Sequence, residues 1–176
     1  MARYQHQLDA TATTAGEIAA QAWDQLDAWD EADIEAFIKL VEPAAAAQAH
    51  GSALAAAFVA LAAGIPVPAV DTSTATPDWR AAFSLYWAEL AKGTPWDEAH
   101  AAGRSQAQAV GYDSVQSAAR ETTTAVDNAT PALTQWQRIP DSGACSWCEE
   151  VAQQTFHSAD SADFGHDRCG CTVAPA

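Results

Sequence analysis

The chain has 176 residues, of which 49% are hydrophobic, and a formal net charge of −15 at pH 7 with only eight Lys and Arg residues. This length suits one domain with a small appendage. The acidity argues against direct, sequence-specific binding of nucleic acid, because contacts to the phosphate backbone need clustered basic side chains. The longest apolar run, Ala53 to Ala63, is shorter than the roughly 20 residues of a membrane-spanning helix, so we expect no membrane partner.

Residues 1–12 have weak periodicity and predict a flexible arm ahead of a helical domain over residues 13–130. A helix is expected from about Thr14, and Asp30 is a suitable N-cap for the next helix. Pro43 should kink or restart that helix, and Gly64 should end its continuation as a C′ residue. Alanine favours helix and close helix approach, while tryptophan, phenylalanine and leucine supply the large core side chains.

Two helix-start signals follow in the same domain. A polar loop is expected over residues 71–76, and the Thr-Pro pairs at 76–77 and 94–95 each predict an N-cap followed by the first helical position. Gly93 should end the first of these helices, and Gly111 should break the second before another helix over 112–128. The buried face of the first is expected to comprise Trp79, Phe83, Trp87 and Leu90.

Residues 131–176 are predicted to form a C-terminal module that contains all four cysteines of the chain. Leu133 to Ile139 alternates in part and predicts a short strand, for which Thr172 to Ala174 is a natural partner. The expected fold is therefore mainly α, a helical bundle followed by a small zinc-stapled α+β module. So small a module buries little apolar surface, and a bound metal would supply the missing stability.

The metal prediction rests on the spacing of Cys145-Ser-Trp-Cys148 and His166-Asp-Arg-Cys169-Gly-Cys171. Structural zinc is held by four Cys or His ligands. The first pair supplies two of them, and three candidates remain for the other two places. We favour Cys145, Cys148, His166 and one of Cys169 or Cys171; an all-cysteine set with His166 behind it stays open.

Two disulfides, free thiols or an iron–sulfur cluster are alternative interpretations of the same cysteines. Disulfides need an oxidising compartment, and the N-terminal residues have no apolar segment of the secretory type. A catalytic zinc is not expected, because the deaminase signature needs His-x-Glu, whereas His157 is followed by Ser158 and Ala159.

No catalytic or organic-cofactor-binding residues are predicted, and we do not expect an enzyme. There is no Gly-x-Ser-x-Gly elbow and no phosphate-binding loop. Glu149 and Glu150 should open a short helix, where acidic side chains suit the helix dipole. The remaining histidines are isolated in the sequence and are interpreted as solvated: His6, His50, His100 and His157.

Three segments of the C-terminal module carry a resemblance to a known family. They are Trp136-Gln-Arg138-Ile-Pro, Gly143-Ala-Cys145-Ser-Trp-Cys148 and Phe164-Gly-His166-Asp-Arg-Cys169-Gly-Cys171-Thr-Val-Ala-Pro175. This module resembles that of phage Mu F-type minor head proteins, in the variant carried by tailed phages of actinobacteria. The chain departs from the pattern at Gly170, where arginine or aspartate is usual, and at Gln154-Thr-Phe156, where a glycine usually precedes the aromatic.

The resemblance implies a minor structural protein of a tailed-phage virion, located in the capsid interior or at the portal vertex and in the host cytoplasm during assembly. It implies a role in head assembly or genome delivery. The implied partners are the portal and/or major capsid protein, with packaged DNA involved only indirectly. Alternatives are a capsid maturation protease or another enzyme, for which no peptide-cleaving residue set is visible, and a zinc-stabilised interaction module unrelated to phage.

Overall fold

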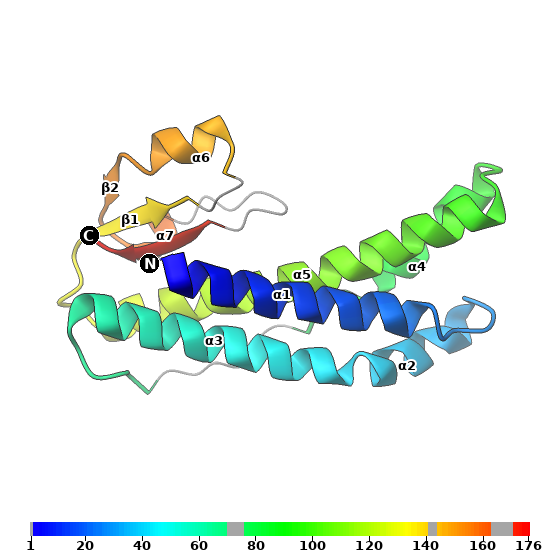
Figure 1. Ribbon diagram of the computed structural model, residues 1–176, viewed down its shortest axis with the longest axis horizontal. Helices are drawn as coiled ribbons and strands as arrows, with labels where there is room; N and C mark the ends of the chain where they lie inside the picture. Colours follow the sequence, from blue (N-terminus) through cyan, green and yellow to red (C-terminus); the bar gives the residue numbers. More distant parts are fainter. Residues whose placement is uncertain (1, 70–75, 141–143, 163–170) are drawn as a thin grey trace.

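The computed structural model describes residues 2–69, 76–140, 144–162 and 171–176. It is mainly helical with a small α+β module at the C-terminus, which confirms the predicted fold class (Figure 1). The bundle consists of α1 (Ala2–Trp23), α2 (Glu31–Leu40), α3 (Glu42–Ala63), α4 (Arg80–Ala91) and α5 (Trp96–Ala129). The module consists of β1 (Trp136–Ile139), α6 (Ser146–Val151), β2 (Thr155–Phe156), α7 (Ala159–Ala162) and β3 (Thr172–Pro175).

The N-terminal residues belong to the bundle, which corrects the prediction of a flexible arm over residues 1–12. Helix α1 already begins at Ala2, and Tyr4, Leu8 and Ala12 are buried. Tyr4 stacks on Phe58 of α3, with ring centroids 4.2 Å apart, and burial raises the pKa of its hydroxyl. Since these contacts join segments far apart in the chain, local periodicity gave no sign of them.

The expected signals around α2 and α3 are confirmed. Asp30 caps α2, and its side chain accepts hydrogen bonds from the amides of Ala32 and Asp33. Pro43 lies in the first turn of α3, so the chain restarts a helix there. Gly64 ends α3 in the left-handed conformation, with φ +66°, where glycine has no Cβ to clash.

Helix α3 is the one helix, among those the structure describes, that is long and apolar enough to cross a bilayer. Its buried residues pack against α1 and α5, which is the position of a core helix in a bundle. Figure 1 shows α1, α3 and α5 lying side by side along the length of the molecule. The exposed part of α3 is mostly alanine, although Leu61 near its end is 83% exposed.

Helix α4 starts later than the sequence predicts. It begins at Arg80, preceded by Trp79 in a helical conformation, rather than at Pro77. Trp79 and Phe83 are buried as expected, Trp87 is half-buried and Leu90 is exposed. Tyr86 takes the predicted place of Leu90 in the core.

The turn from α4 into α5 also differs by one residue. The N-cap of α5 is Pro95 rather than Thr94. The Thr94 hydroxyl instead donates a hydrogen bond of 2.9 Å to Glu89, and Lys92 donates one of 2.6 Å to the same carboxylate. The bond from Lys92, and then that from Thr94, hold the pKa of Glu89 below its ordinary value.

The predicted break at Gly111 is wrong, because α5 runs unbroken from Trp96 to Ala129. Gly111 lies where α5 crosses α1. A Cβ atom added to it would meet the carbonyl oxygen of Ala15 at 2.6 Å and the Cα of Gly16 at 3.0 Å. The glycine is therefore a contact residue that lets two backbones approach closely, and tertiary packing overrides its low helix propensity.

The module is built on a three-stranded antiparallel sheet with the order β2-β1-β3. The predicted pairing of the Trp136 strand with the C-terminal strand is confirmed, in a register that joins Trp136 to Pro175 and Ile139 to Thr172. The short strand β2 was not predicted. Glu149 lies in the first turn of α6, in agreement with the expected short helix.

Candidate metal centre

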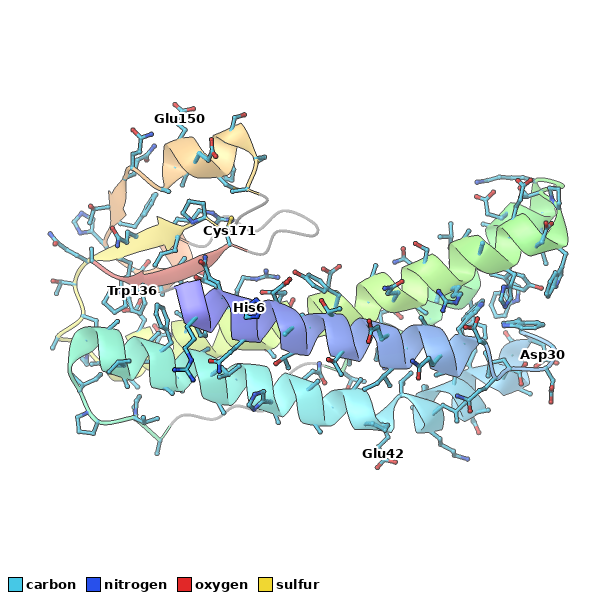
Figure 2. All side chains as sticks on the ribbon, in the orientation of Figure 1. His6, Asp30, Glu42, Trp136, Glu150 and Cys171 are labelled. Atoms are coloured by element: carbon cyan, nitrogen blue, oxygen red, sulfur yellow. The ribbon has the colours of Figure 1, made fainter. Side chains whose placement is uncertain are left out.

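The structure describes three of the five predicted zinc ligands. Cys145 is the exposed N-cap residue of α6, and Cys148 lies one turn further along that helix. Cys171 comes immediately before β3, and Figure 2 places it at the start of that strand, on the side that faces α6. His166 and Cys169 lie outside the described residues.

Cys148 and Cys171 pack together in a small buried cluster, with Ala144 against them. Their exposed fractions are 0% and 3%. The two residues come from the two separate cysteine motifs, so the fold brings together what the spacing predicted as two halves of one site. Deprotonated cysteine thiols are preferred zinc ligands, so this buried pair could supply two of the four that a structural zinc ion needs.

The described residues alone do not complete such a site. Among residues 2–69, 76–140, 144–162 and 171–176, no three His, Cys, Asp or Glu side chains lie close enough together to hold one ion. The choice between the histidine-containing and the all-cysteine ligand set therefore depends on residues 163–170, and both remain predictions.

Arg138 connects the elements that surround the cysteines. It lies in the middle of β1 and is 2% exposed. One guanidinium nitrogen donates a hydrogen bond of 3.3 Å to the carbonyl oxygen of Ala162, the last residue of α7. The guanidinium carbon also lies 5.9 Å from the centre of the ring of Trp147, a residue of α6. Arg138 therefore joins β1 to both short helices, a role that its presence in a Trp-x-Arg strand did not reveal.

The module is anchored to the bundle by Trp136, which is fully buried. It shares one hydrophobic cluster with the bundle residues Ala56, Val59 and Val126 and with the module residues Ala159, Ala162 and Val173. Figure 2 shows Trp136 between the sheet and the ends of the bundle helices. At the other edge, the Gln5 side chain of α1 donates hydrogen bonds of 3.1 Å to the carbonyl oxygens of Ile139 and Pro140.

Asp127 provides a polar link at the same junction. One of its carboxylate oxygens accepts a hydrogen bond of 2.9 Å from the Trp136 indole, and the other accepts one of 2.8 Å from the amide of Ala159. The first bond orients the anchoring ring, and the second satisfies an amide at the start of α7. Nothing in the sequence around Asp127 distinguishes it from the other acidic residues of this chain.

Replacing Asp127 with asparagine should lower the free energy of unfolding by about 1–2 kcal/mol. Asparagine keeps one acceptor oxygen but turns an NH₂ group toward a second N–H donor. Urea denaturation followed by tryptophan fluorescence measures the change. Glu121→Gln removes an exposed charge from the same helix and is the matched control. It should change the free energy of unfolding by less than about 0.5 kcal/mol. Equal effects would show that Asp127 is not a link.

Most of the isolated histidines behave as predicted. His6, His50 and His157 are exposed. His100 is different, because it is half-buried and packs against the rings of Trp29 and Trp96 at the far end of the bundle. The solvated interpretation is therefore wrong for His100.

The comparison with known families decides the origin of the chain. The family model described as VG15 protein matches residues 1–176. The chain belongs to the VG15 family. It is a phage-encoded protein. No curated protein and no solved structure matches the chain.

Proposed function

We propose that this VG15-family protein is a minor structural protein of a tailed-phage virion, of the Mu F type, that acts in head morphogenesis. Its place is the capsid interior or the portal vertex, and its direct partners are the portal protein, the major capsid protein or both. The proposal gives it no catalytic residues and no direct contact with a nucleic-acid sequence.

The observation that carries the proposal is the meeting of Cys148 and Cys171 in one buried cluster of a phage protein. The resemblance to Mu F-type head proteins rests on the two motifs to which these residues belong. Had the motifs lain on different faces of the module, the resemblance would be a coincidence of spacing. The packing of Cys148, in α6, on Cys171, just before β3, supports the module as a folded unit.

The proposal includes a structural zinc ion in the module. Cys148 and Cys171, which already meet, would hold it, with the other ligands drawn from Cys145, His166 and Cys169. Zinc supplies cross-links between segments that have little apolar surface of their own. Two sets of contacts support this assignment. Arg138 joins β1 to α6 and α7, and β1 pairs with β3, so the start of β3 is fixed relative to α6.

The virion assignment is tested on purified particles. Quantitative mass spectrometry of proheads and mature virions should find the chain in both, at a copy number far below that of the major capsid protein. Cross-linking before digestion should join it to the portal or the major capsid protein. Absence of the chain from washed proheads and virions would contradict the proposal.

The enzymatic alternative, a capsid maturation protease, has a separate test. A phage with a nonsense codon early in this gene should still process its major capsid protein to the normal mass, if it forms proheads. Accumulation of an uncleaved capsid protein in the mutant, with cleavage restored by adding the purified chain, would favour the protease instead.

For the zinc site, Cys148→Ser should lower the affinity for zinc by more than about 100-fold, since even indirect supports of metal ligands are worth 10–100-fold. Competition with a chromogenic chelator measures this. Ser146→Ala, an exposed position in the same helix, is the matched control and should keep the affinity of the unmodified chain. If Cys148→Ser bound zinc as tightly as the control, Cys148 would not be a ligand.

A further inference from the structure

The rings of Trp29, Trp96 and His100 contact one another in a cluster here called the aromatic tip. Figure 1 shows that the turn between α1 and α2 and the start of α5, which carry these residues, lie at the end of the bundle opposite the module. Trp96 is the first residue of α5 and is 52% exposed. Its ring stacks on His100 with the centroids 5.0 Å apart and meets Trp29 edge to face at 5.4 Å. His100 also meets Trp29 edge to face, at 4.8 Å. Trp29 and His100 are half-buried, so they hold Trp96 as an exposed, ordered aromatic ring, a feature typical of interaction sites.

The rings of the aromatic tip are held in place by the chain around Trp29. Trp29 has φ +52°, a left-handed conformation that is uncommon for a bulky residue. Its amide donates a hydrogen bond of 2.7 Å to Asp33, and its carbonyl oxygen accepts one of 2.8 Å from the Trp87 indole. These bonds offset the strain of the backbone. The aromatic surface is thus formed before any partner arrives, which lowers the entropic cost of binding.

The charge around the aromatic tip is acidic. Asp27 and Asp30 flank Trp29, and Asp97 and Glu98 follow Trp96. All four of these carboxylates are on exposed residues. The basic residues that border these segments, Lys92 and Arg104, are already paired with Glu89 and Asp24. Anionic ligands such as nucleic acid or an acidic membrane surface are repelled here. A cationic group, by contrast, meets both a π-face and carboxylate acceptors.

We propose that the aromatic tip binds an arginine-bearing segment of a partner protein. A guanidinium group stacks on the indole face of tryptophan and, in the same plane, donates paired hydrogen bonds to a carboxylate. Lysine offers a compact, strongly hydrated charge and fits this combination less well. The inference does not rest on the proposed virion role, since it uses residues of the bundle and none of the module.

The test uses the full-length chain, labelled with nitrogen-15, and octa-arginine as the probe at about 0.1 M salt, where the Debye length is near 10 Å. The indole N–H signals of the seven tryptophans report on both ends of the molecule. Those of Trp96 and Trp29 should shift on titration, while those of Trp136 and Trp147 stay in place. Octa-lysine should bind several-fold more weakly. Shifts spread evenly over both ends, or equal binding of the two peptides, would overturn the proposal.

Two variants and a matched control sharpen the test. Trp96→Ala should weaken octa-arginine binding by about tenfold, and Asp27→Asn by about two- to threefold. Glu150→Gln removes the same charge from the opposite end of the molecule, where Figure 2 labels Glu150 far from Asp30, and should leave binding within experimental error. Equal effects of Asp27→Asn and Glu150→Gln would show general charge attraction and overturn the site. Trp96→Phe, which keeps a ring, should retain most of the affinity and confirms that the alanine result reflects the ring.

Discussion

Trp136→Ala should lower the free energy of unfolding by about 3–5 kcal/mol, the cost of removing a large buried aromatic side chain. Trp136 is 0% exposed and touches residues from the bundle and from the module in one cluster. The substitution leaves a cavity at that junction and removes the hydrogen bond to Asp127. Domains of this kind are stable by only about 5–15 kcal/mol, so the change should be visible as a large shift of the urea midpoint.

Two further variants divide this effect into its parts. Trp136→Phe keeps a ring but loses the indole N–H, and should cost less than the alanine variant. Trp147→Ala is the matched control, because that tryptophan lies in the same module but is 45% exposed; losing its contact with Arg138 should cost about 1 kcal/mol or less. If Trp136→Ala and Trp147→Ala had the same midpoint, the module would not depend on the buried ring for its attachment.

Gly111→Val should lower the free energy of unfolding by about 3 kcal/mol or more, since overpacking by added carbons costs about 1–3 kcal/mol and more where the neighbours cannot move. The nearest atoms to an added Cβ are backbone atoms of Ala15 and Gly16 in α1. They belong to a helix whose position is fixed by its whole buried face, so α1 and α5 must separate. Equilibrium denaturation again measures the loss.

The alanine variant at the same position gives an intermediate point. Gly111→Ala meets the same backbone with one carbon, but it also gains about 1 kcal/mol of helix propensity, so we expect a net loss of about 1 kcal/mol. Ser105→Ala, at an exposed position of α5, is the control and should be neutral or slightly stabilising. A stabilised Gly111→Ala variant would mean that the helices do not cross as closely at this point as the structure describes.

The features of the fold that were predicted correctly depend on signals within a few residues. Asp30 caps α2 through amides two and three residues ahead, and Gly64 ends α3 through its own backbone conformation. The fold class and the pairing of β1 with β3 followed from such local patterns and from alternation. The errors lie where distant segments meet, as at Tyr4, which packs on α3, and at Gly111, which contacts α1.

The candidate site shows the same difference between local sequence signals and contacts of distant segments. The cysteine spacing predicted that the two motifs form one site, and one cysteine from each motif, Cys148 and Cys171, packs in the same buried cluster. The metal and its ligand set stay predictions. The supporting residues were not predicted. Arg138 bonds to a carbonyl 24 residues away, and Asp127 to an amide 32 residues away, and single-sequence patterns carry no record of such partners. His100 is a third case, since one of its aromatic neighbours, Trp29, comes from another part of the chain.

Native mass spectrometry of the purified chain tests most directly whether the module holds zinc. It is combined with thiol titration, first of the native chain and then of the chain denatured in the presence of a chelator. One zinc ion per chain is the predicted result, with four thiols that react after denaturation and chelation and at least three that are protected beforehand. This would show that the buried pair Cys148 and Cys171 belongs to a metal-stabilised module. A chain without metal whose cysteines stay unreactive after denaturation would contradict the account, because the cysteines would then be joined as disulfides.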